Sequence, residues 1–305
     1  MIEAISCAKV NFSLRIGPVQ EDGLHRVGGH FQSISWTDRL TFEWGEEDSL
    51  AAIDGGPVIA GWDNLVWQAA ALIRAEAGSQ RPLRIGLGKS IPAAAGLGGG
   101  SGNGAAALAT VGRMCGVAVT SELAAKLGSD VPFCLRGGSA EVAGTGETLY
   151  PRDVPSGFSL GLVVPPVELS TAAVFRQWDE MGGPSGTPVA GSDLPPALRG
   201  DDQIVNDLYP AAAAVAPLLE EWRHELERRW GRPALLTGSG PTLFGFFVDD
   251  AEAAGALDAV PPGARATAVA EPVPFGWVGR DDATMWSFAE LDDATRELAH
   301  RLFAG

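Results

Sequence analysis

Cysteine is scarce in this sequence, and the few cysteines are widely separated. Cys7, Cys115 and Cys134 are the only three in the chain, and no two of them form a Cys-x-x-Cys pair. An odd number without paired spacing argues against a disulfide framework and against a structural zinc site. The four histidines form no HExxH or HxxxH pair, so a histidine metal centre is not expected either. The cysteine content is typical of a reducing compartment, and we expect a cytoplasmic protein.

Positive charge and long apolar runs are also lacking. The chain has 22 Lys and Arg against 38 Asp and Glu, for a net charge of −16. Nucleic acids and anionic membranes are bound largely through Lys and Arg, so a surface this acidic repels both. No apolar run reaches the roughly 18 residues of a membrane span, and no signal peptide is recognisable. We expect a small-molecule substrate, no nucleic acid and no membrane, with a monomer or a homodimer both open.

The overall composition is that of a globular protein with a sizeable core. Hydrophobic residues make up 46% of the 305 positions, and 40 glycines and 21 prolines are spread along the chain. This length accommodates two domains. We predict an N-terminal domain over residues 1–155, a second domain over 156–272, and a C-terminal extension with one helix over 273–305.

The order of predicted elements indicates an α+β protein. Strand-like segments follow one another without a helix over the first 44 residues, with a predicted turn at Thr37-Asp38, so this sheet is antiparallel or mixed. Residues 64–77 have helix character. The second domain alternates strands and helices, from a strand at 158–164 to one at 265–270. The tail is expected to carry a helix over 288–303 that covers the second domain.

The most distinctive stretch is PAAAGLGGGSGNGAAAL, residues 92–108. It lies between a strand-like run at 83–91 and a small-residue helix predicted from about Asn103 to Gly116. A glycine-rich loop that opens a helix directs backbone N–H groups and the positive end of the helix dipole at an anion, usually a phosphate. The alternative is a flexible linker, but linkers are rarely held between a strand and an Ala-rich helix. We therefore predict a phosphate-binding loop.

Two common phosphate-loop types do not fit this stretch. Gly88-Lys89-Ser90 matches the end of a Walker A loop, but Leu83 stands where its first glycine must be. Of the Rossmann fingerprint, only a weak alanine variant fits, at Gly100, Gly102 and Ala105. The first eighty residues also lack βαβ alternation. The loop therefore belongs to neither of these two classes.

Two charged residues stand out within apolar surroundings. Lys9 and Asn11 alternate with Val10 and Phe12 in the first strand, which places them on the opposite face from the apolar side chains. Lys9 is either a solvated charge at a sheet edge or part of a site. Asp130 precedes the Val-Pro pair of LGSDVPF and is either a helix N-cap or a buried functional group. The residues by themselves leave both alternatives open.

Four segments together, AKVNFSLRI, PAAAGLGGGSGNGAA, LGSDVPFCLRGGSAEVAGTGE and TGSGPTLFG, resemble the GHMP kinase superfamily. The resemblance runs from about Cys7 to Val269, in the family's order. It implies a two-domain α/β sandwich with the active site in the cleft between domains, and ATP and Mg²⁺ as cofactors. The resemblance is greatest to members that phosphorylate the 2-hydroxyl of a cytidine diphosphate-linked methylerythritol in non-mevalonate isoprenoid biosynthesis.

The resemblance also implies roles for individual residues. Lys9 and Asp130 are the implied catalytic pair. The implied ATP-binding residues lie in the glycine loop, with Ser101 also beside the metal: Pro92, Gly96, Leu97, Gly98, Gly99, Gly100, Ser101, Gly102 and Asn103. The implied substrate-binding residues come from four segments: Asn11, His25, Phe175, Thr237, Gly238, Ser239 and Gly240.

The chain departs from the family pattern at two of these places. Leu24 replaces the tyrosine that stacks on the cytosine base, and Asn103 replaces an acidic residue near the metal. Two alternatives therefore stay open: another GHMP kinase, acting on a mevalonate-like or homoserine-like alcohol, and a non-catalytic nucleotide-binding homologue.

Overall fold

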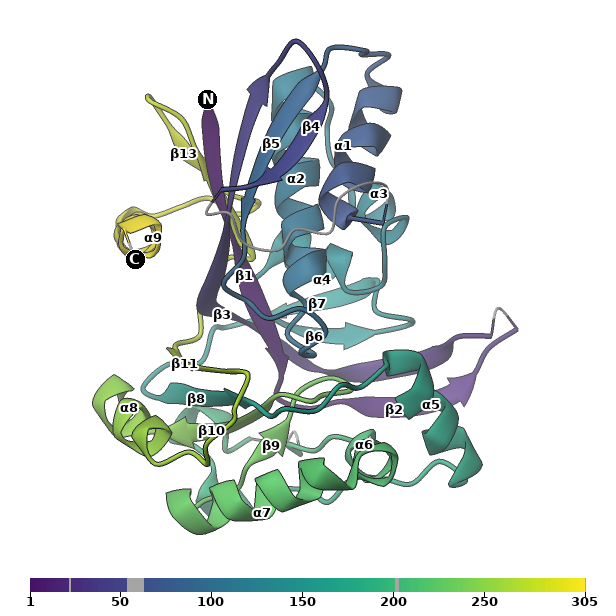
Figure 1. The fold of residues 1–305 in the computed structure, drawn as a ribbon, viewed down its shortest axis with the longest axis vertical. Coiled ribbons are helices and arrows are strands. Elements are labelled where there is room, and N and C mark those ends of the chain that lie inside the picture. The colour runs from purple at the N-terminus through teal and green to yellow at the C-terminus, as the bar shows by residue number, and fades with distance from the viewer. Residues whose placement is uncertain (22, 54–62, 201–202, 305) are drawn as a thin grey trace.

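The computed structural model describes residues 1–21, 23–53, 63–200 and 203–304, which form two β-sheets with helices packed around them (Figure 1). Within this part of the chain, the first sheet holds β1 (Ile2–Asn11), β2 (Arg15–Val19), β3 (His25–Trp44), β4 (Ser49–Ala52), β5 (Leu83–Gly88), β6 (Ser139–Ala143), β7 (Thr148–Arg152), β12 (Trp277–Arg280) and β13 (Met285–Trp286). The second sheet holds β8 (Ser159–Val164), β9 (Leu235–Leu236), β10 (Leu243–Phe247) and β11 (Ala266–Ala270). The predicted α+β class is confirmed.

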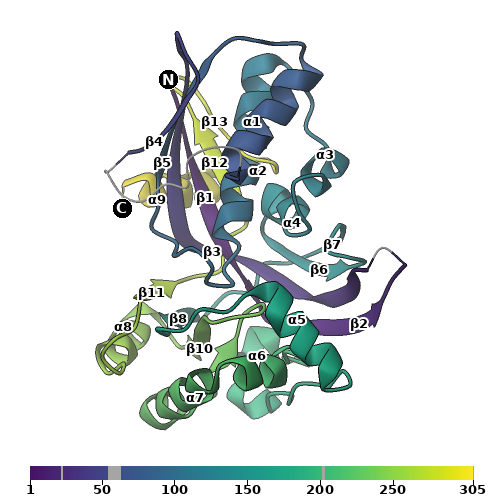
Figure 2. The same cartoon turned by 45° about the vertical axis from the view of Figure 1, so that its right-hand side comes forward.

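Helices cover both faces of the first sheet and the outer side of the second. They are α1 (Leu65–Glu76), α2 (Gly99–Cys115), α3 (Ser121–Ala125), α4 (Val131–Arg136), α5 (Thr171–Glu180), α6 (Tyr209–Val215), α7 (Pro217–Trp230), α8 (Asp250–Asp258) and α9 (Asp293–Ala304). α1 and α2 lie on one face of the first sheet and α9 on the other (Figures 1 and 2). Among the described helices, none combines the length and apolar character needed to cross a membrane.

The strand β3 continues through the position where a turn is predicted, so the prediction at Thr37-Asp38 is wrong. The pairing with β1 instead shifts register, from Cys7 opposite Thr37 to Ala8 opposite Ile34. Such a bulge bends a strand without ending it. The Asp38 side chain is fully buried, and its Oδ1 accepts hydrogen bonds from the backbone N–H groups of residues 90 and 91. These partners satisfy a carboxylate that the sequence suggests is exposed in a turn.

A shared apolar core joins the two sheets. Val10 of β1 and Phe12, the residue that follows the strand, pack in one cluster with Leu160 and Leu162 of β8 and Phe244 of β10. The alternation of β1 therefore directs its apolar side chains toward the second sheet, as period-2 patterning requires. The opposite side of the same strand is left for Lys9 and Asn11.

The C-terminal segment belongs to the first sheet, so the expectation that it covers the second domain is wrong. β12 pairs antiparallel with β1, from Glu3 opposite Arg280 to Ser6 opposite Trp277. Phe275, Val278 and Phe303 pack in a cluster with Ile5 and Cys7 of β1. The reason is that β1 has a free edge for one more strand, and its far face needs an apolar cover.

Candidate active site

The central pocket lies between the first sheet and the helices of the second, and has a volume of about 350 Å³. Its lining brings together segments that are far apart in the sequence. They include Lys9 and Asn11 of β1, the loop from Pro92 to Ser101, Asp130, Thr171 and Phe175 of α5, Leu208, and Gly238 with Ser239. Most of the residues singled out in the sequence therefore surround one cavity.

Lys9 is the buried cation of this pocket, with only 5% of the residue exposed. Its Nζ donates a hydrogen bond to Asn11 Oδ1 at 2.9 Å and lies 3.3 Å from Asp130 Oδ2. It also lies 4.9 Å from the centre of the Phe31 ring. A buried ammonium group is tolerated when it is paired in this way. The arrangement answers the alternative left open by the sequence: Lys9 is not a solvated edge charge.

Asp130 precedes α4 but makes no capping hydrogen bond with its side chain. Its carboxylate is one-third exposed and lies at the pocket, beside Lys9. Of the two alternatives for Asp130, the structure therefore disfavours the N-cap. Four residues further on, burial raises the pKa of the Cys134 thiol, and the charge of Asp130 raises it further. That thiol therefore stays protonated at neutral pH.

The glycine loop wraps around the stem of Lys9. Gly98 adopts φ +66°, and a Cβ atom there would stand 2.8 Å from Lys9 Cγ. Gly96 adopts φ +76°, and a Cβ atom there would stand 2.7 Å from the carbonyl oxygen of Thr237. Both positions need the left-handed conformation and the absence of a side chain. The loop therefore packs directly on β1 and on the turn 237–240.

Helix α2 begins at Gly99, four residues before its predicted start at Asn103, with Gly98 as its N-cap. Its first turn, Gly99 to Ser101, lines the pocket. The first N–H groups of a helix lack intrahelical partners and carry the positive end of the dipole. The pocket thus contains a site suited to an anion.

Gly102 and Asn103 lie further along α2, where the helix contacts β1. A Cβ atom on Gly102 would stand 2.9 Å from the Cys7 carbonyl oxygen, so this glycine allows close packing on β1. The side-chain oxygen of Asn103 accepts a hydrogen bond from Ser6 Oγ, and the residue is 3% exposed. This hydrogen bond to Asn103 links α2 to β1. Asn103 also lines a second pocket, which adjoins the central one.

The adjoining pocket, about 580 Å³, opens beside the glycine loop and is largely apolar. It is lined by Leu65, Leu87, Ile91 and the Pro92–Ala94 segment, with Lys89 at one side. Lys89 Nζ pairs with the buried carboxylate of Asp38 and stands 3.2 Å from where a Cβ on Gly99 would be. Sequence reasoning missed this pair, although Lys89 was visible in the Walker-like GKS match.

His25 and Phe175 lie on the opposite side of the central pocket. Their rings stack at 5.4 Å, with 28° between the planes. Both ring nitrogens of His25 are engaged, Nδ1 with the Gly17 carbonyl oxygen at 3.0 Å and Nε2 with Asp179 Oδ2 at 3.2 Å. Phe175 lines the pocket, with His25 stacked against it, while Leu24 is 54% exposed.

The turn from Thr237 to Gly240 closes the pocket between Asn11 and α5. Thr237 is fully buried, and its hydroxyl accepts from the Asn11 N–H at 3.0 Å. Ser239 Oγ lies 2.9 Å from the hydroxyl of Thr171, which also lines the pocket. Sequence reasoning missed Thr171; the signal was a second hydroxyl residue directly after the expected helix cap Ser170.

The donor set tests whether a divalent cation fits. Among residues 1–21, 23–53, 63–200 and 203–304, no group of three or more His, Cys, Asp or Glu side chains could hold a metal ion. The lining of the pocket includes Ser101 in the first turn of α2, with a hydroxyl, and Asp130, with a carboxylate. Such a sparse oxygen set fits Mg²⁺ that keeps most of its ligands from phosphate and water, and does not fit a dedicated protein cage.

The chain is similar in sequence to known kinases. Residues 64–138 match the model of the GHMP kinases N terminal domain. A 4-diphosphocytidyl-2-C-methyl-D-erythritol kinase of Pelotomaculum thermopropionicum is 37% identical over 259 residues, covering 82% of this chain and 90% of its own length. The kinase of the same name from Rhodococcus jostii is 35% identical, with 90% and 94% covered.

The fold is also similar to those of kinases with solved structures. A crystal structure of 4-(cytidine 5'-diphospho)-2C-methyl-D-erythritol kinase superposes with a TM-score of 0.70 at 31% identity, covering 88% of this chain and 99% of that one. A homoserine kinase from Cytophaga hutchinsonii superposes with a TM-score of 0.64 at 17% identity, covering 92% and 97%. The second likeness concerns the fold alone.

Proposed function

The chain belongs to the 4-diphosphocytidyl-2-C-methyl-D-erythritol kinase family of the GHMP kinases, and we propose that it transfers the γ-phosphoryl group of ATP to the 2-hydroxyl of that alcohol. It is a phosphotransferase of the non-mevalonate isoprenoid route. The observation that carries the proposal is the Lys9–Asp130 pair, 3.3 Å apart and facing the first turn of α2 across one pocket.

The residues divide the work of phosphoryl transfer. Asp130 accepts the proton of the acceptor hydroxyl while the oxygen of that hydroxyl forms a bond to the γ-phosphorus. The bond between the γ-phosphorus and the oxygen that bridges to the β-phosphate breaks, and ADP is released. Lys9 offsets negative charge at the acceptor oxygen. Asn11 holds Lys9 through the 2.9 Å hydrogen bond and is itself held by Thr237. The protein's main contribution is positioning, as in phosphoryl transfer generally.

ATP binding uses the loop and the adjoining pocket. The N–H groups of Gly98 to Ser101 bind the phosphates, and the largely apolar 580 Å³ pocket takes the nucleoside, with Lys89 near the phosphates. The Ser101 hydroxyl would hold Mg²⁺, which would supply positive charge to offset that of the phosphates. On the acceptor side, Phe175 offers an aromatic face to the cytosine and Ser239 offers a hydroxyl.

An ADP-release assay with ATP, Mg²⁺ and a panel of alcohols tests the proposal. We expect turnover with 4-diphosphocytidyl-2-C-methyl-D-erythritol and none above background with mevalonate or homoserine. Turnover with one of those two alcohols alone would assign the chain to another GHMP activity. ATP binding without turnover of any alcohol would make it a non-catalytic homologue. NMR of the product decides whether the 2-hydroxyl carries the new phosphate.

The Asp130→Asn variant tests the proton acceptor. The amide keeps the size of the carboxylate but cannot take the proton, so we expect kcat to fall by about 10² to 10⁴-fold. The Kd of ATP, measured by calorimetry, should stay within about twofold. Asp153→Asn, at an exposed aspartate, is the matched control and should retain wild-type kcat. Near-normal kcat in Asp130→Asn would remove Asp130 from the chemistry.

A further inference from the structure

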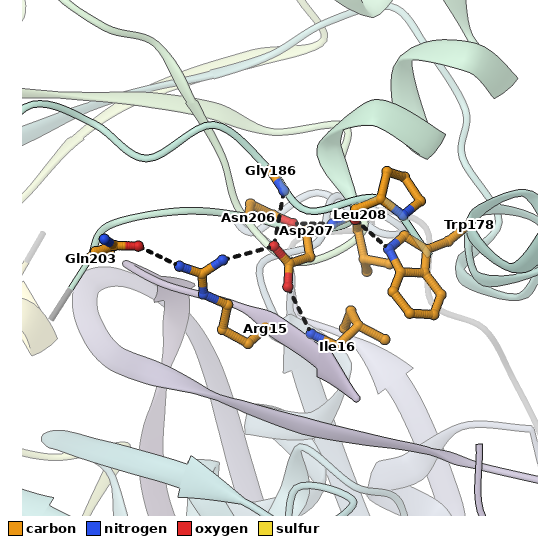
Figure 3. A network of polar contacts seen from close by, with 9 residues as sticks. Arg15, Ile16, Trp178, Gly186, Gln203, Asn206, Asp207 and Leu208 are labelled. Atoms are coloured by element: carbon orange, nitrogen blue, oxygen red, sulfur yellow. Dashed lines mark hydrogen bonds and ion pairs between the residues drawn. The ribbon is translucent and has the colours of Figure 1, made fainter. Parts of the chain in front are cut away.

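Two neighbouring side chains just before α6, Asn206 and Asp207, lie at the centre of a network of polar contacts between segments far apart in the sequence (Figure 3). Asp207 is 4% exposed. Its Oδ2 accepts from the Ile16 N–H at 3.1 Å, and its Oδ1 accepts from the Gly186 N–H at 2.9 Å and from Arg15 at 3.2 Å. One buried carboxylate thus joins β2 to the loop that follows α5.

Asn206 makes the corresponding connections toward the pocket. Its Nδ2 donates to the carbonyl oxygens of Leu236 and Gly238, both at 2.8 Å. Its Oδ1 accepts from the Leu208 N–H at 2.9 Å. Leu208 and Gly238 both line the central pocket. The side chain of Asn206 therefore sets the spacing between two walls of the site.

Backbone contacts hold the pair itself in place. The Asp207 N–H donates to the Leu14 carbonyl oxygen at 2.9 Å, and the Leu14 N–H donates to Val205 at 2.7 Å. A Cβ atom on Gly186 would stand 2.2 Å from the Asn206 carbonyl oxygen, so the loop approaches closely. Every polar atom of these two side chains has a hydrogen-bond partner, so the pair joins β2, the loop after α5 and the turn 237–240 in one polar network.

We propose that Asn206 and Asp207 are positioning residues for the acceptor substrate. Neither lines the central pocket, and they act through the elements they hold. Asp207 fixes the ribbon of β2 and β3, in which Gly17 holds His25, and His25 stacks on Phe175. Asn206 fixes the turn that carries Ser239. The first turn of α2, which faces the ATP phosphates, receives no hydrogen bond from either side chain in the described part of the chain.

Two isosteric variants test this inference, which rests on the proposed function. Asp207→Asn keeps the shape but replaces one acceptor oxygen by a donor, leaving a buried N–H group without an acceptor. Asn206→Asp keeps the acceptor for Leu208 but loses both donors. Because each change leaves buried polar groups unpaired, we expect the KM for the acceptor alcohol to rise about tenfold in each. The KM for ATP should stay within about twofold.

Arg15→Gln is the matched control. The Arg15 side chain is 41% exposed, and its removal leaves both peptide N–H groups bound to Asp207. The acceptor KM should stay within about twofold, because exposed ion pairs contribute little. The two test variants alter different segments, so one remains informative if the other does not fold, which thermal denaturation reports.

The outcomes separate the two proposals. If the wild-type chain does not phosphorylate the alcohol, the proposed function is wrong, and this inference with it. If the wild-type chain is active but both KM values rise together, or only the melting temperature falls, the positioning role alone is wrong. A rise confined to the acceptor KM supports it.

Discussion

At the scale of single residues, the site depends on small features that let a charge be buried. Lys9 is the clearest example, because its ammonium group has an amide, a carboxylate and an aromatic face around it. Its stem packs where Gly98 has no side chain. The pocket therefore contains a cation at a fixed position that does not have to be ordered when substrate binds, which lowers the cost of binding.

Leu24 gives a prediction about base recognition. It is 54% exposed on the β2–β3 ribbon, beside His25, where the family resemblance places a tyrosine. Leu24→Tyr adds an aromatic face. We expect the acceptor KM to fall about threefold, the change in binding that corresponds to the energy of one aromatic pair. Val19→Tyr, at a 56% exposed position of the same ribbon, is the control and should leave KM unchanged. An equal effect in both variants would contradict a specific stacking role at position 24.

Two buried thiols give a prediction about pH. Burial raises the pKa of both Cys7 and Cys134 well above the ordinary value of 9.0. Above pH 9 the unfolded thiols ionise while the folded ones stay protonated, so the folded state binds more protons and loses stability as pH rises. We expect the free energy of unfolding to fall by up to about 1.4 kcal/mol per pH unit for each thiol.

Urea denaturation between pH 8 and 10.5 measures this slope. The Cys7→Ala, Cys134→Ala double variant should have a flatter dependence on pH than the wild-type chain, since the ionising groups are gone. Identical slopes in the two proteins would mean that other groups cause the loss.

At the scale of elements, α2 is capped by a glycine at each terminus, for different reasons. Gly98 and Gly116 both adopt the left-handed conformation as N-cap and C-cap. The N-terminal end faces the pocket and packs on Lys9, whereas a Cβ atom on Gly116 would meet nothing within 4 Å. The glycines before the helix therefore serve the site, and the one after it serves only to end the helix.

A pair of alanine variants separates backbone strain from close packing. Gly96→Ala and Gly116→Ala carry similar strain, at φ +76° and +71°, and we expect each to lose about 1 kcal/mol of stability from it. Gly96→Ala also drives its Cβ toward the Thr237 and Gly240 carbonyl oxygens, so it should lose about 2 kcal/mol more and raise the KM for ATP. Denaturation midpoints and ATP kinetics measure both effects. Equal losses would show that the loop is not tightly packed on the turn.

At the scale of the whole molecule, the two chain ends complete one sheet. β1 begins the chain and is paired with β3 on one side and β12 on the other. The apolar face of β1 near Ile5 is covered by Val273, Phe275 and α9. The strand that carries Lys9 is therefore central in the sheet, with the tail paired along its first half.

Phe275 tests how the tail contributes. It is 1% exposed, and Phe275→Ala should cost about 3 to 5 kcal/mol of stability by leaving a cavity. The KM for ATP should change by less than about twofold, since the side chain lines neither the central nor the adjoining pocket. Phe288→Ala, at a 47% exposed position of the same tail, should leave the melting temperature nearly unchanged. A large change in ATP KM with intact stability would assign the tail a functional role.

Much of the local structure and of the site could be predicted from the sequence, because these features depend on residues close together in the chain. Alternation in the first strand set Lys9 and Asn11 apart from Val10 and Phe12. The glycine run predicted a loop before α2, although the helix starts earlier than expected because its glycines tolerate the helix, with Gly102 packed closely on β1 and Gly104 on α1. The spaced motifs indicated the kinase family.

The tertiary structure alone decided which distant residues meet. Asn103 bonds Ser6, Asp38 binds the 89–91 turn, and the tail pairs with β1 rather than covering the second sheet. Asn206 and Asp207 likewise meet Ile16, Gly186 and Gly238 only in the folded chain. The physical reason is that periodicity and propensity act over a few residues. A buried polar group, by contrast, takes its partner from whichever segment the packing of the whole chain brings within about 3 Å.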